Sequence, residues 1–309
     1  MVTPKGSVRE ADPGRMEGMV IKIVSDFFTV RSSSGSLECR RRRRLDLYGD
    51  GGGIMVGDRV RVLELGVGKG MIEERFPRRN GLRRPRIANV DRAVVVGSFG
   101  TPAPDFFSID RILVQVETEG LEAVVCLNKA DLAAPGETDA ARMIYSATGY
   151  PVVITSAKSG EGLEALREAL RDSITVLAGP SGVGKSTMLN ALLPGVALRM
   201  GEVSLKRGTG RHTTRHVELL PMADGSWVAD TPGFQQLDLS FIDPVELASF
   251  FPDLAPYRSE CRFSRDCVHD REPGCRVKEA VEAGEVSRER YDSYLRLLRE
   301  IRERFQPWK

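Results

Sequence analysis

Four short nucleotide-binding motifs occur along this chain, and their order constrains its fold. NKAD (128–131) and TSAK (155–158) come first, and GPSGVGKST (179–187) and DTPG (230–233) come later. Together they are the parts of a GTP-binding domain, which ordinarily begins with the phosphate loop and ends with the motifs that read the base. The chain is therefore predicted to hold a circularly permuted α/β domain whose last motif leads directly into the C-terminal third.

The glycine-rich motif has the sequence context that a phosphate loop requires. It follows the apolar run at 174–178 and precedes an expected helix at 186–193. Glycines let backbone N–H groups wrap phosphates at a helix N-terminus. Lys185 is then expected to reach the β- and γ-phosphates, and the Ser186 hydroxyl is expected to ligate Mg²⁺. This loop alone does not separate ATP from GTP.

The NKAD motif makes that separation. It ends a predicted apolar strand, where loop residues meet a ligand at the carboxyl edge of a parallel sheet. The carboxylate of Asp131 can accept hydrogen bonds from N1–H and the exocyclic amine of guanine, whereas adenine offers no matching pair of donors. The TSAK motif follows another predicted strand and is expected to bring the Ala157 backbone to the base, with Lys158 nearby.

The DTPG motif and the basic, glycine-rich stretch at 208–214 are the expected switch segments. Asp230 would hold Mg²⁺ through water, and the Gly233 N–H would sense the γ-phosphate. One threonine of the stretch is expected to cap Mg²⁺ and the γ-phosphate. Thr214 is favoured for this role, and Thr213 is the alternative.

The residue that orients the attacking water is less obvious. Phe234 stands where many GTPases carry a glutamine. A phenyl ring cannot orient water, so another polar group is needed, and His212 is the local candidate. His212 could instead contact an RNA phosphate or be a loop residue with no ligand. A catalytic His212 predicts slow intrinsic hydrolysis that a partner raises by ordering the loop.

The predicted site residues form three sets. Hydrolysis is assigned to His212, Lys185 and Thr214. Mg²⁺ is assigned to Ser186 and Thr214. The residues expected to bind GTP are Asn128, Lys129, Asp131, Ser156, Ala157, Lys158, Gly179, Pro180, Ser181, Gly182, Val183, Gly184, Lys185, Ser186, Thr187, Thr213, Thr214, Asp230 and Gly233.

A cluster of cysteines and histidine lies near the C-terminus. Cys261-x5-Cys267-x-His269-x5-Cys275 supplies three thiolates and one imidazole, a complete tetrahedral set for one structural zinc ion. Four protein ligands leave no open position for catalysis. The surrounding residues are polar and charged, and such a segment has little core of its own without metal. The alternative is a group of buried cysteines that merely lie close in the sequence.

The formal net charge of +2 is unevenly distributed. Residues 1–90 hold 19 Lys and Arg against 11 Asp and Glu, a net charge of +8, and the remainder carries −6. Two basic runs, at 40–44 and 75–86, concentrate the positive charge. One such run alone is often a solvated loop, but two in a single β-rich segment favour contact with nucleic-acid phosphates.

The hydrophobic pattern divides the chain into three parts. Short alternating segments at about 16–74 predict a small OB-fold barrel, which binds nucleic acid on its open face. From residue 90, apolar strands alternate with helices, as in a parallel sheet covered on both faces. The third part is helical, and its last apolar stripe indicates a packing face. The predicted domains are an OB-fold domain at 1–80, the permuted GTPase domain at 81–238 and a helical zinc-binding domain at 239–309.

Two remaining features concern the compartment. No apolar run approaches the roughly 18 residues that span a membrane. The N-terminus lacks the apolar stretch of a signal peptide, so a cytoplasmic location is expected. Of the two cysteines outside the cluster, Cys126 lies in an apolar run and is expected to be core, whereas Cys39 has no assigned role.

These residues together resemble the RsgA (YjeQ) family of circularly permuted GTPases, which act on the small ribosomal subunit of bacteria. The resemblance covers nearly the whole chain: the barrel-like start with VGDRV (56–60), the connector at 77–91, every GTPase motif, GRHTT (210–214) and the terminal Cys/His cluster. It implies GTP hydrolysis stimulated by the small subunit, a role in late subunit maturation, and bound Mg²⁺ and zinc. Arg215 departs from the family pattern, in which a third threonine is usual.

The expected partners are the small ribosomal subunit with its rRNA, and GTP or GDP; no membrane is expected, and the chain is expected to be a monomer. One rival is an RNA-binding protein that holds guanine nucleotide without hydrolysing it, which the intact Lys185, Ser186 and Asp230 argue against. Another is a signalling GTPase independent of RNA, which leaves the basic N-terminal part and the Cys/His cluster unexplained.

Overall fold

The computed structural model describes residues 14–42, 53–83, 85–101, 103–193, 217–222, 225–230, 239–263 and 265–304. It divides into two compact units. The first contains Met1–Val90 with Thr214–Leu220, and the second contains Asp91–Thr213 with Pro221–Lys309. Among the described residues, no helix is long and apolar enough to cross a membrane.

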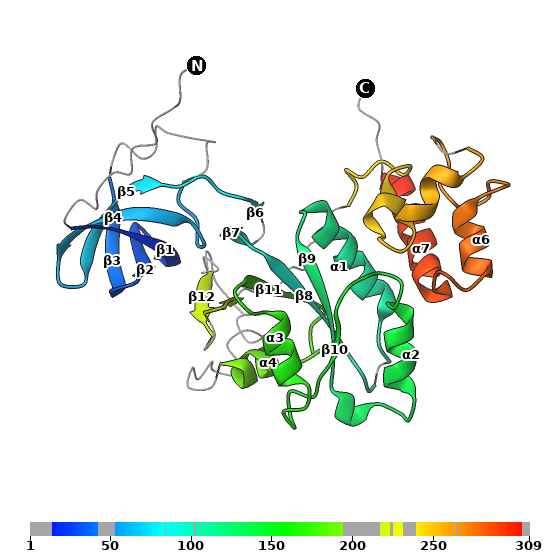
Figure 1. The fold of residues 1–309 in the computed structure, drawn as a ribbon, viewed down its shortest axis with the longest axis horizontal. Helices are drawn as coiled ribbons and strands as arrows, with labels where there is room; N and C mark the ends of the chain where they lie inside the picture. Colours follow the sequence, from blue (N-terminus) through cyan, green and yellow to red (C-terminus); the bar gives the residue numbers. More distant parts are fainter. Residues whose placement is uncertain are drawn as a thin grey trace, which may run out of the picture. The chain divides into compact units, whose positions relative to one another are not determined.

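Five strand pairings, four antiparallel and one parallel, close the first unit into a barrel (Figure 1, blue to cyan). Strand β1 pairs with β2 and β4, β2 with β3, β3 with β5 in parallel, and β5 with β4. This ring order is that of the five-stranded OB-fold, so the barrel prediction is confirmed. The strands are β1 (Arg15–Val24), β2 (Phe27–Ser32), β3 (Gly35–Arg41), β4 (Arg59–Gly66) and β5 (Lys69–Arg75).

The barrel core is built from the inward-facing positions of these strands, as alternation requires. Cys39 is one of its fully buried residues, beside Val62 and Ile72. Burial raises the pKa of the Cys39 thiol to about 11, so the side chain is an uncharged core residue at neutral pH. The residue that the sequence left without a role therefore packs the barrel.

A buried ion pair fixes the connector that follows the barrel. Asp58 is fully buried, and Arg78 donates from Nε and Nη2 to its two carboxylate oxygens at 2.6 and 2.8 Å. Asn89 donates to the Gly57 carbonyl at 2.9 Å. Part of the second basic run thus holds the connector in place. The short hairpin of β6 (Gly81–Arg83) and β7 (Arg86–Ala88) lies within it.

A strand that lies far from the barrel in the sequence joins this unit. Strand β12 (Glu218–Pro221) pairs with β1 in an antiparallel register that sets Glu218 opposite Lys22. Lys22 Nζ lies 2.8 Å from Glu218 Oε2. The segment that follows the expected switch stretch in sequence is thereby held at the barrel.

The second unit is organised around a parallel sheet with the strand order β10-β9-β8-β11-β13. Helices α3 and α4 pack against each other, whereas α1 and α2 both contact the C-terminal helix α7. The predicted alternation of strands and helices is confirmed. The strands are β8 (Arg92–Ser98), β9 (Glu122–Asn128), β10 (Val152–Ile154), β11 (Ile174–Ala178) and β13 (Trp227–Asp230). The helices are α1 (Phe106–Thr118), α2 (Glu137–Ile144), α3 (Leu163–Ala169) and α4 (Lys185–Leu192), with a 3-10 turn η2 (Ala130–Leu132).

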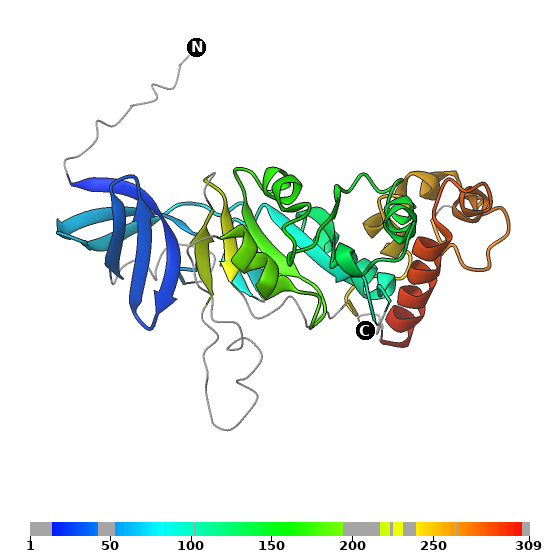
Figure 2. The same ribbon diagram turned by 90° about the horizontal axis from the view of Figure 1, so that it is seen from below.

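The C-terminal segment packs on α1, and Figure 2 shows α7 (red) running beside it. Its apolar cluster includes Val114 of α1, so this core is continuous with the face of that helix. Of the predicted stripe of α7, Tyr291, Tyr294, Leu298 and Ile301 are buried and Leu295 is half-buried against the same cluster, which confirms it as a packing face. The segment contains η3 (Leu247–Phe250), η4 (Ala255–Glu260), α6 (Arg276–Glu282) and α7 (Arg288–Arg304).

Candidate functional site

The nucleotide motifs gather at the carboxyl ends of the parallel strands. NKAD begins with the last residue of β9, TSAK follows β10, and the glycine-rich loop follows β11. The chain first adds strands on one side of β8 and then continues with β11 on the other side. The carboxyl ends of β8 and β11 therefore mark the point where strand order reverses, which is where open α/β sheets bind ligands.

The phosphate loop (179–187) turns directly into α4. Gly184 precedes the helix with φ +97°, and Gly179 has φ +143°. A Cβ on Gly179 would lie 2.3 Å from the Val96 carbonyl oxygen, so only glycine fits between the loop and β8. This close approach opens the loop backbone toward the helix N-terminus, the arrangement that binds phosphate oxygens.

Lys185 reaches back across the loop that precedes it. Its Nζ donates to the carbonyl oxygens of Gly179 at 2.8 Å and Pro180 at 2.7 Å. Partial burial lowers the pKa of Lys185 from its usual value. Ser186 is half-buried on the first turn of α4, and Thr187 and Ser181 are exposed. The ammonium is thus placed within the loop, where it can exchange carbonyl acceptors for phosphate oxygens.

Asn128 connects three loops from a fully enclosed position. Its Nδ2 donates to the Val183 carbonyl at 2.8 Å, which attaches it to the phosphate loop. Its Oδ1 accepts from the Ala157 N–H at 3.0 Å and from Thr155 Oγ1 at 3.3 Å. The side chain is 2% exposed. The sequence predicts Asn128 as a nucleotide ligand, and the structure places its side chain in a bridge between the glycine-rich loop and the TSAK segment.

Asp131 is exposed and oriented for a ligand. Ser156 Oγ donates to its Oδ1 at 2.6 Å, and Ser156 itself is buried. This hydrogen bond is the largest influence on the Asp131 carboxyl and holds its pKa below the usual value. Lys129 has a left-handed backbone (φ +60°) that turns the chain between Asn128 and Asp131. The ionised carboxylate can therefore accept the N–H donors of a guanine.

Several predicted site residues lie outside the described part of the chain. His212, Thr213, Thr214 and Gly233 are among them, and Asp230 is described only as the backbone end of β13. The other predicted nucleotide residues belong to the three loops at the carboxyl edge of the sheet.

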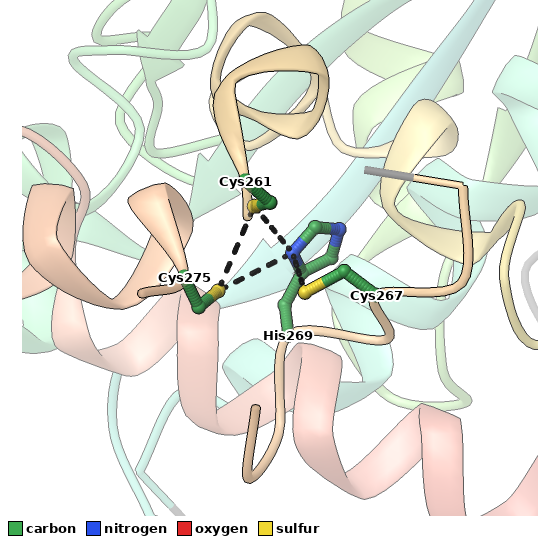
Figure 3. Close-up of side chains that lie close together, drawn as sticks. All are labelled: Cys261, Cys267, His269 and Cys275. Carbon is green, nitrogen blue, oxygen red and sulfur yellow. Dashed lines mark hydrogen bonds between the residues drawn. The ribbon is translucent and has the colours of Figure 1, made fainter. Parts of the chain in front are cut away.

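The four predicted metal ligands come together in the C-terminal segment (Figure 3). His269 Nδ1 lies 3.5 Å from Cys261 Sγ and 3.4 Å from both Cys267 Sγ and Cys275 Sγ. Cys261 Sγ lies 3.9 Å from Cys275 Sγ. A zinc tetrahedron with ordinary bond lengths has N···S edges of about 3.5 Å and S···S edges of about 3.8 Å. All four donor atoms lie within 4.8 Å of one another, close enough to hold one metal ion.

Burial opposes the charged forms of these four donors. All four side chains are buried, and burial raises the pKa of Cys267 to about 12. Burial also lowers the pKa of His269 to about 4, so the imidazole is neutral and able to ligate through Nδ1. A bound cation would favour the thiolate forms that burial opposes.

Neighbouring side chains hold the backbone of the loop that carries Cys261, Cys267, His269 and Cys275, called the metal loop below. Tyr291 and Tyr294 of α7 donate to the carbonyl oxygens of His269 and Val268, both at 2.7 Å. The Glu272 carboxylate accepts from the Val268 and Asp270 N–H groups at 3.3 and 2.9 Å. The sequence indicated only a packing role for the tyrosines. Their spacing placed them on the buried face, but nothing in it showed where the hydroxyls point.

The comparisons with known proteins agree with this geometry. The family model described as RsgA GTPase matches residues 75–240. "Small ribosomal subunit biogenesis GTPase RsgA" of Moorella thermoacetica is 44% identical over 286 residues, which cover 93% of this chain and 97% of the relative. The protein of the same name from Alkaliphilus metalliredigens is 43% identical over 292 residues, 93% and 98% of the two chains.

Two solved structures match over nearly their full length. YjeQ from Thermotoga maritima has a TM-score of 0.81 at 38% identity and covers 94% of this chain and 99% of its own. YloQ, described as a circularly permuted GTPase, has a TM-score of 0.80 at 34% identity, with 98% and 100% covered. The permuted motif order, the sheet-edge site, the family model and these relatives lead to one conclusion: the chain belongs to the RsgA GTPase family.

Proposed function

We propose that this GTPase acts in the biogenesis of the small ribosomal subunit, and that GTP hydrolysis controls its interaction with that subunit. The observation that carries the nucleotide part is the position of Asp131, exposed and held by Ser156 in a motif that Asn128 joins to the phosphate loop. The subunit part is supported by the names of relatives that match across almost the whole chain. The cytoplasm, where subunits are assembled, is the proposed location, and a monomer is the proposed form.

Within the site, each predicted residue has a proposed role. Lys185 neutralises charge on the β- and γ-phosphates, and Ser186 ligates Mg²⁺. Asp131 reads guanine, and the Ala157 N–H contacts the base. Thr214 caps Mg²⁺ and the γ-phosphate, with Thr213 as its alternative. Mg²⁺, held by Ser186 and Thr214, would offset the negative charge that develops on the phosphates in hydrolysis.

The switch residues complete the proposed mechanism. Asp230 contacts Mg²⁺ through water, and the Gly233 N–H senses the γ-phosphate. His212 orients the attacking water, because Phe234 at the usual glutamine position has no polar group. The other motif residues predicted to bind GTP, the first of them Asn128 and the last Thr187, are proposed as the remaining nucleotide contacts.

The barrel is the proposed rRNA-binding surface. Arginine side chains lie over two aromatic rings there. Arg59 and Arg61 lie over Phe76, with guanidinium-to-centroid distances of 5.9 and 5.1 Å. Arg40 lies over Phe27, at 4.8 Å. Such pairs combine positive charge for phosphates with π-faces for unstacked bases. The net charge of +8 in residues 1–90 supports this assignment.

The Cys261, Cys267, His269 and Cys275 set is the proposed site of one structural Zn²⁺. Its four donors match the number and type that closed zinc sites use. Bound zinc would cross-link the polar loop that carries these four residues. The C-terminal segment that carries it is proposed as a second contact with rRNA.

Nucleotide choice and subunit dependence test this proposal together. GTP hydrolysis is expected under single-turnover conditions, with little ATP hydrolysis, and added small subunits should raise the rate. Lys185→Ala should abolish hydrolysis in both conditions. Equal affinity for ATP and GTP would contradict the base-reading assignment. Failure of subunits to raise the rate or to co-sediment with the protein at low salt would contradict the ribosomal role.

A further inference from the structure

Helix α7 contacts the metal loop through two hydroxyl groups on one face. Tyr291 Oη donates to the His269 carbonyl and Tyr294 Oη donates to the Val268 carbonyl, each at 2.7 Å. Both tyrosines are buried, and their rings stack with centroids 6.2 Å apart. The two tyrosines of α7 thus hold the backbone of His269, a predicted metal ligand, and of the residue before it. The orientation of His269 therefore depends on the position of α7.

The residue before Tyr291 connects the same turn of α7 to the nucleotide-binding domain. Arg290 donates from Nε and Nη2 to the two carboxylate oxygens of Asp253 at 3.0 and 2.7 Å. Its Nη1 donates to Asp110 Oδ1 of α1 at 2.7 Å. Tyr145 Oη donates to the same Asp110 oxygen at 3.2 Å. One buried guanidinium therefore ties α7 to α1, the helix that follows β8 in the sheet.

The guanidinium has a single geometry that satisfies these partners. Arg290 is 1% exposed, and its flat face lies over Phe251 with the guanidinium carbon 4.7 Å from the ring centroid. A bidentate pair with one carboxylate and a further bond to another fix all three nitrogens. A small rotation or shift of α7 would leave buried charges without partners, which is strongly unfavourable. The contact thus favours one position of α7 on α1.

We propose that α7 couples the metal centre to α1, so that metal binding and the docking of the C-terminal segment on the nucleotide-binding domain strengthen each other. In this arrangement Tyr291 and Tyr294 are positioning residues for the metal loop, and Arg290 is the connection to α1. The inference rests on metal occupancy of the site proposed above. Coupling of this kind is reciprocal: whatever loosens α7 on α1 weakens metal binding, and metal loss loosens α1.

Hydrogen exchange of the full chain with and without bound zinc tests this coupling directly. Metal removal by a chelator is expected to raise exchange both at 261–275 and at amides of α1 (Phe106–Thr118). Helix α3 (Leu163–Ala169), which packs on α4, is the internal control and should change little. An unchanged α1, or an equal rise in α1 and α3, would overturn the proposal. This measurement requires no variant.

Two variants locate the connection. Arg290→Lys keeps the positive charge but cannot make the forked contacts, so it should still bind zinc, more weakly, while α1 exchange becomes high with or without metal. Arg299→Lys is the matched control, because Arg299 is exposed on the same helix and donates only to the Leu295 carbonyl among the bonds described. If α1 in Arg290→Lys responds to metal as in the parent chain, Arg290 is not the connection and the proposal fails.

Zinc affinity, measured by competition with a chromophoric chelator, tests the tyrosines. The double change Tyr291→Phe with Tyr294→Phe is expected to lower affinity about 10-fold or more, as loss of supporting hydrogen bonds does at other metal sites. Ser173→Ala is the control, because its buried hydroxyl donates to the Leu170 carbonyl at 2.5 Å, in the loop before β11 and outside both α1 and α7. Unchanged affinity in the double variant would refute the positioning role. If the parent chain binds no zinc at all, the metal assignment itself fails, which is a separate result.

Discussion

Arg290 Nη1 lies 2.7 Å from Asp110 Oδ1, and both side chains are buried, at 1% and 0% exposure. The two residues are 180 positions apart in the sequence. A charged pair in such a place is stable only with its further partners, here Asp253 and Tyr145. It shows that the C-terminal segment and the nucleotide-binding domain share one interior.

Arg290→Met should destabilise the protein severely. The change removes the guanidinium and leaves the Asp110 and Asp253 carboxylates buried without their cation, which lowers the free energy of unfolding by about 3–5 kcal/mol. Urea denaturation of the zinc-loaded chain measures the loss. Arg299→Met should alter stability by less than about 0.5 kcal/mol because its side chain is exposed. Comparable losses in the two variants would show that the buried pair is not decisive.

Asp131→Asn should change the base preference of the site. The amide loses the ionised acceptor that Ser156 orients, so GTP affinity should fall about 10- to 100-fold, the range for a hydrogen bond to a charged group. Xanthosine triphosphate, which presents an acceptor where guanine has its amine, should bind better than in the parent chain. Titration calorimetry with both nucleotides measures the shift. Asp139→Asn, an exposed change on α2, should leave both affinities unchanged.

Gly184→Ala should disrupt the link between the phosphate loop and the NKAD motif. A Cβ there would lie 2.3 Å from Asn128 Nδ2, and the backbone has φ +97°, which disfavours any side chain. Asn128 would have to give up its hydrogen bond to the Val183 carbonyl. Loss of this neutral hydrogen bond, together with backbone strain, should lower GTP affinity by at least about 10-fold.

Gly149→Ala provides the comparison for that variant. Its φ is +75°, but a Cβ at residue 149 meets nothing within 4 Å. This change carries backbone strain of about 1–2 kcal/mol without displacing a site residue. Its unfolding free energy should drop while nucleotide affinity stays constant. If both glycine variants bind GTP equally well, Asn128 does not organise the site.

Cys275→Ser should release zinc and loosen the C-terminal segment. The change replaces one donor of the four-residue set, and the polar side chains between the donors are mostly exposed, so they contribute little core to the loop. Metal content by atomic emission should drop below one ion per chain, and limited proteolysis should cut at 261–275. Cys39→Ala, in the barrel core, should keep its zinc although it loses some stability. Full zinc content in Cys275→Ser would contradict the site.

The barrel surface predicts a salt-dependent contact with RNA. Replacing Arg59 and Arg61 with glutamine removes two positive charges beside Phe76. Binding to small subunits should weaken, and the dependence of log affinity on log salt should become shallower by about one to two ions. Lys69→Gln, at the opposite end of the β4–β5 hairpin, is the control. Because Lys69→Gln removes one charge and the double change removes two, an effect of the double change no larger than twice that of the control would indicate only a loss of general charge.

Local patterns in the sequence were sufficient for much of the fold. The alternation in β4 and the continuous apolar runs of β8, β9 and β11 predicted a barrel and a parallel sheet, because side-chain periodicity reports which faces are buried. The spacing of three cysteines and one histidine predicted a metal-binding cluster, and the structure brings the four residues together. Short motifs succeed in this way because each contains most of the chemistry of its own site.

Contacts between distant residues needed the tertiary structure. The sequence predicted that Asn128, Ser156 and Lys185 belong to one nucleotide site, but not that Asn128 joins two loops through Val183 and Ala157. It did not indicate that Arg290 of α7 is buried, or that Asp110 is its partner. Periodicity fixes which way a side chain faces within its own element. Which distant groups it meets depends on how the elements pack, because a buried charge or hydrogen-bond donor is satisfied by whatever partner that packing brings within reach.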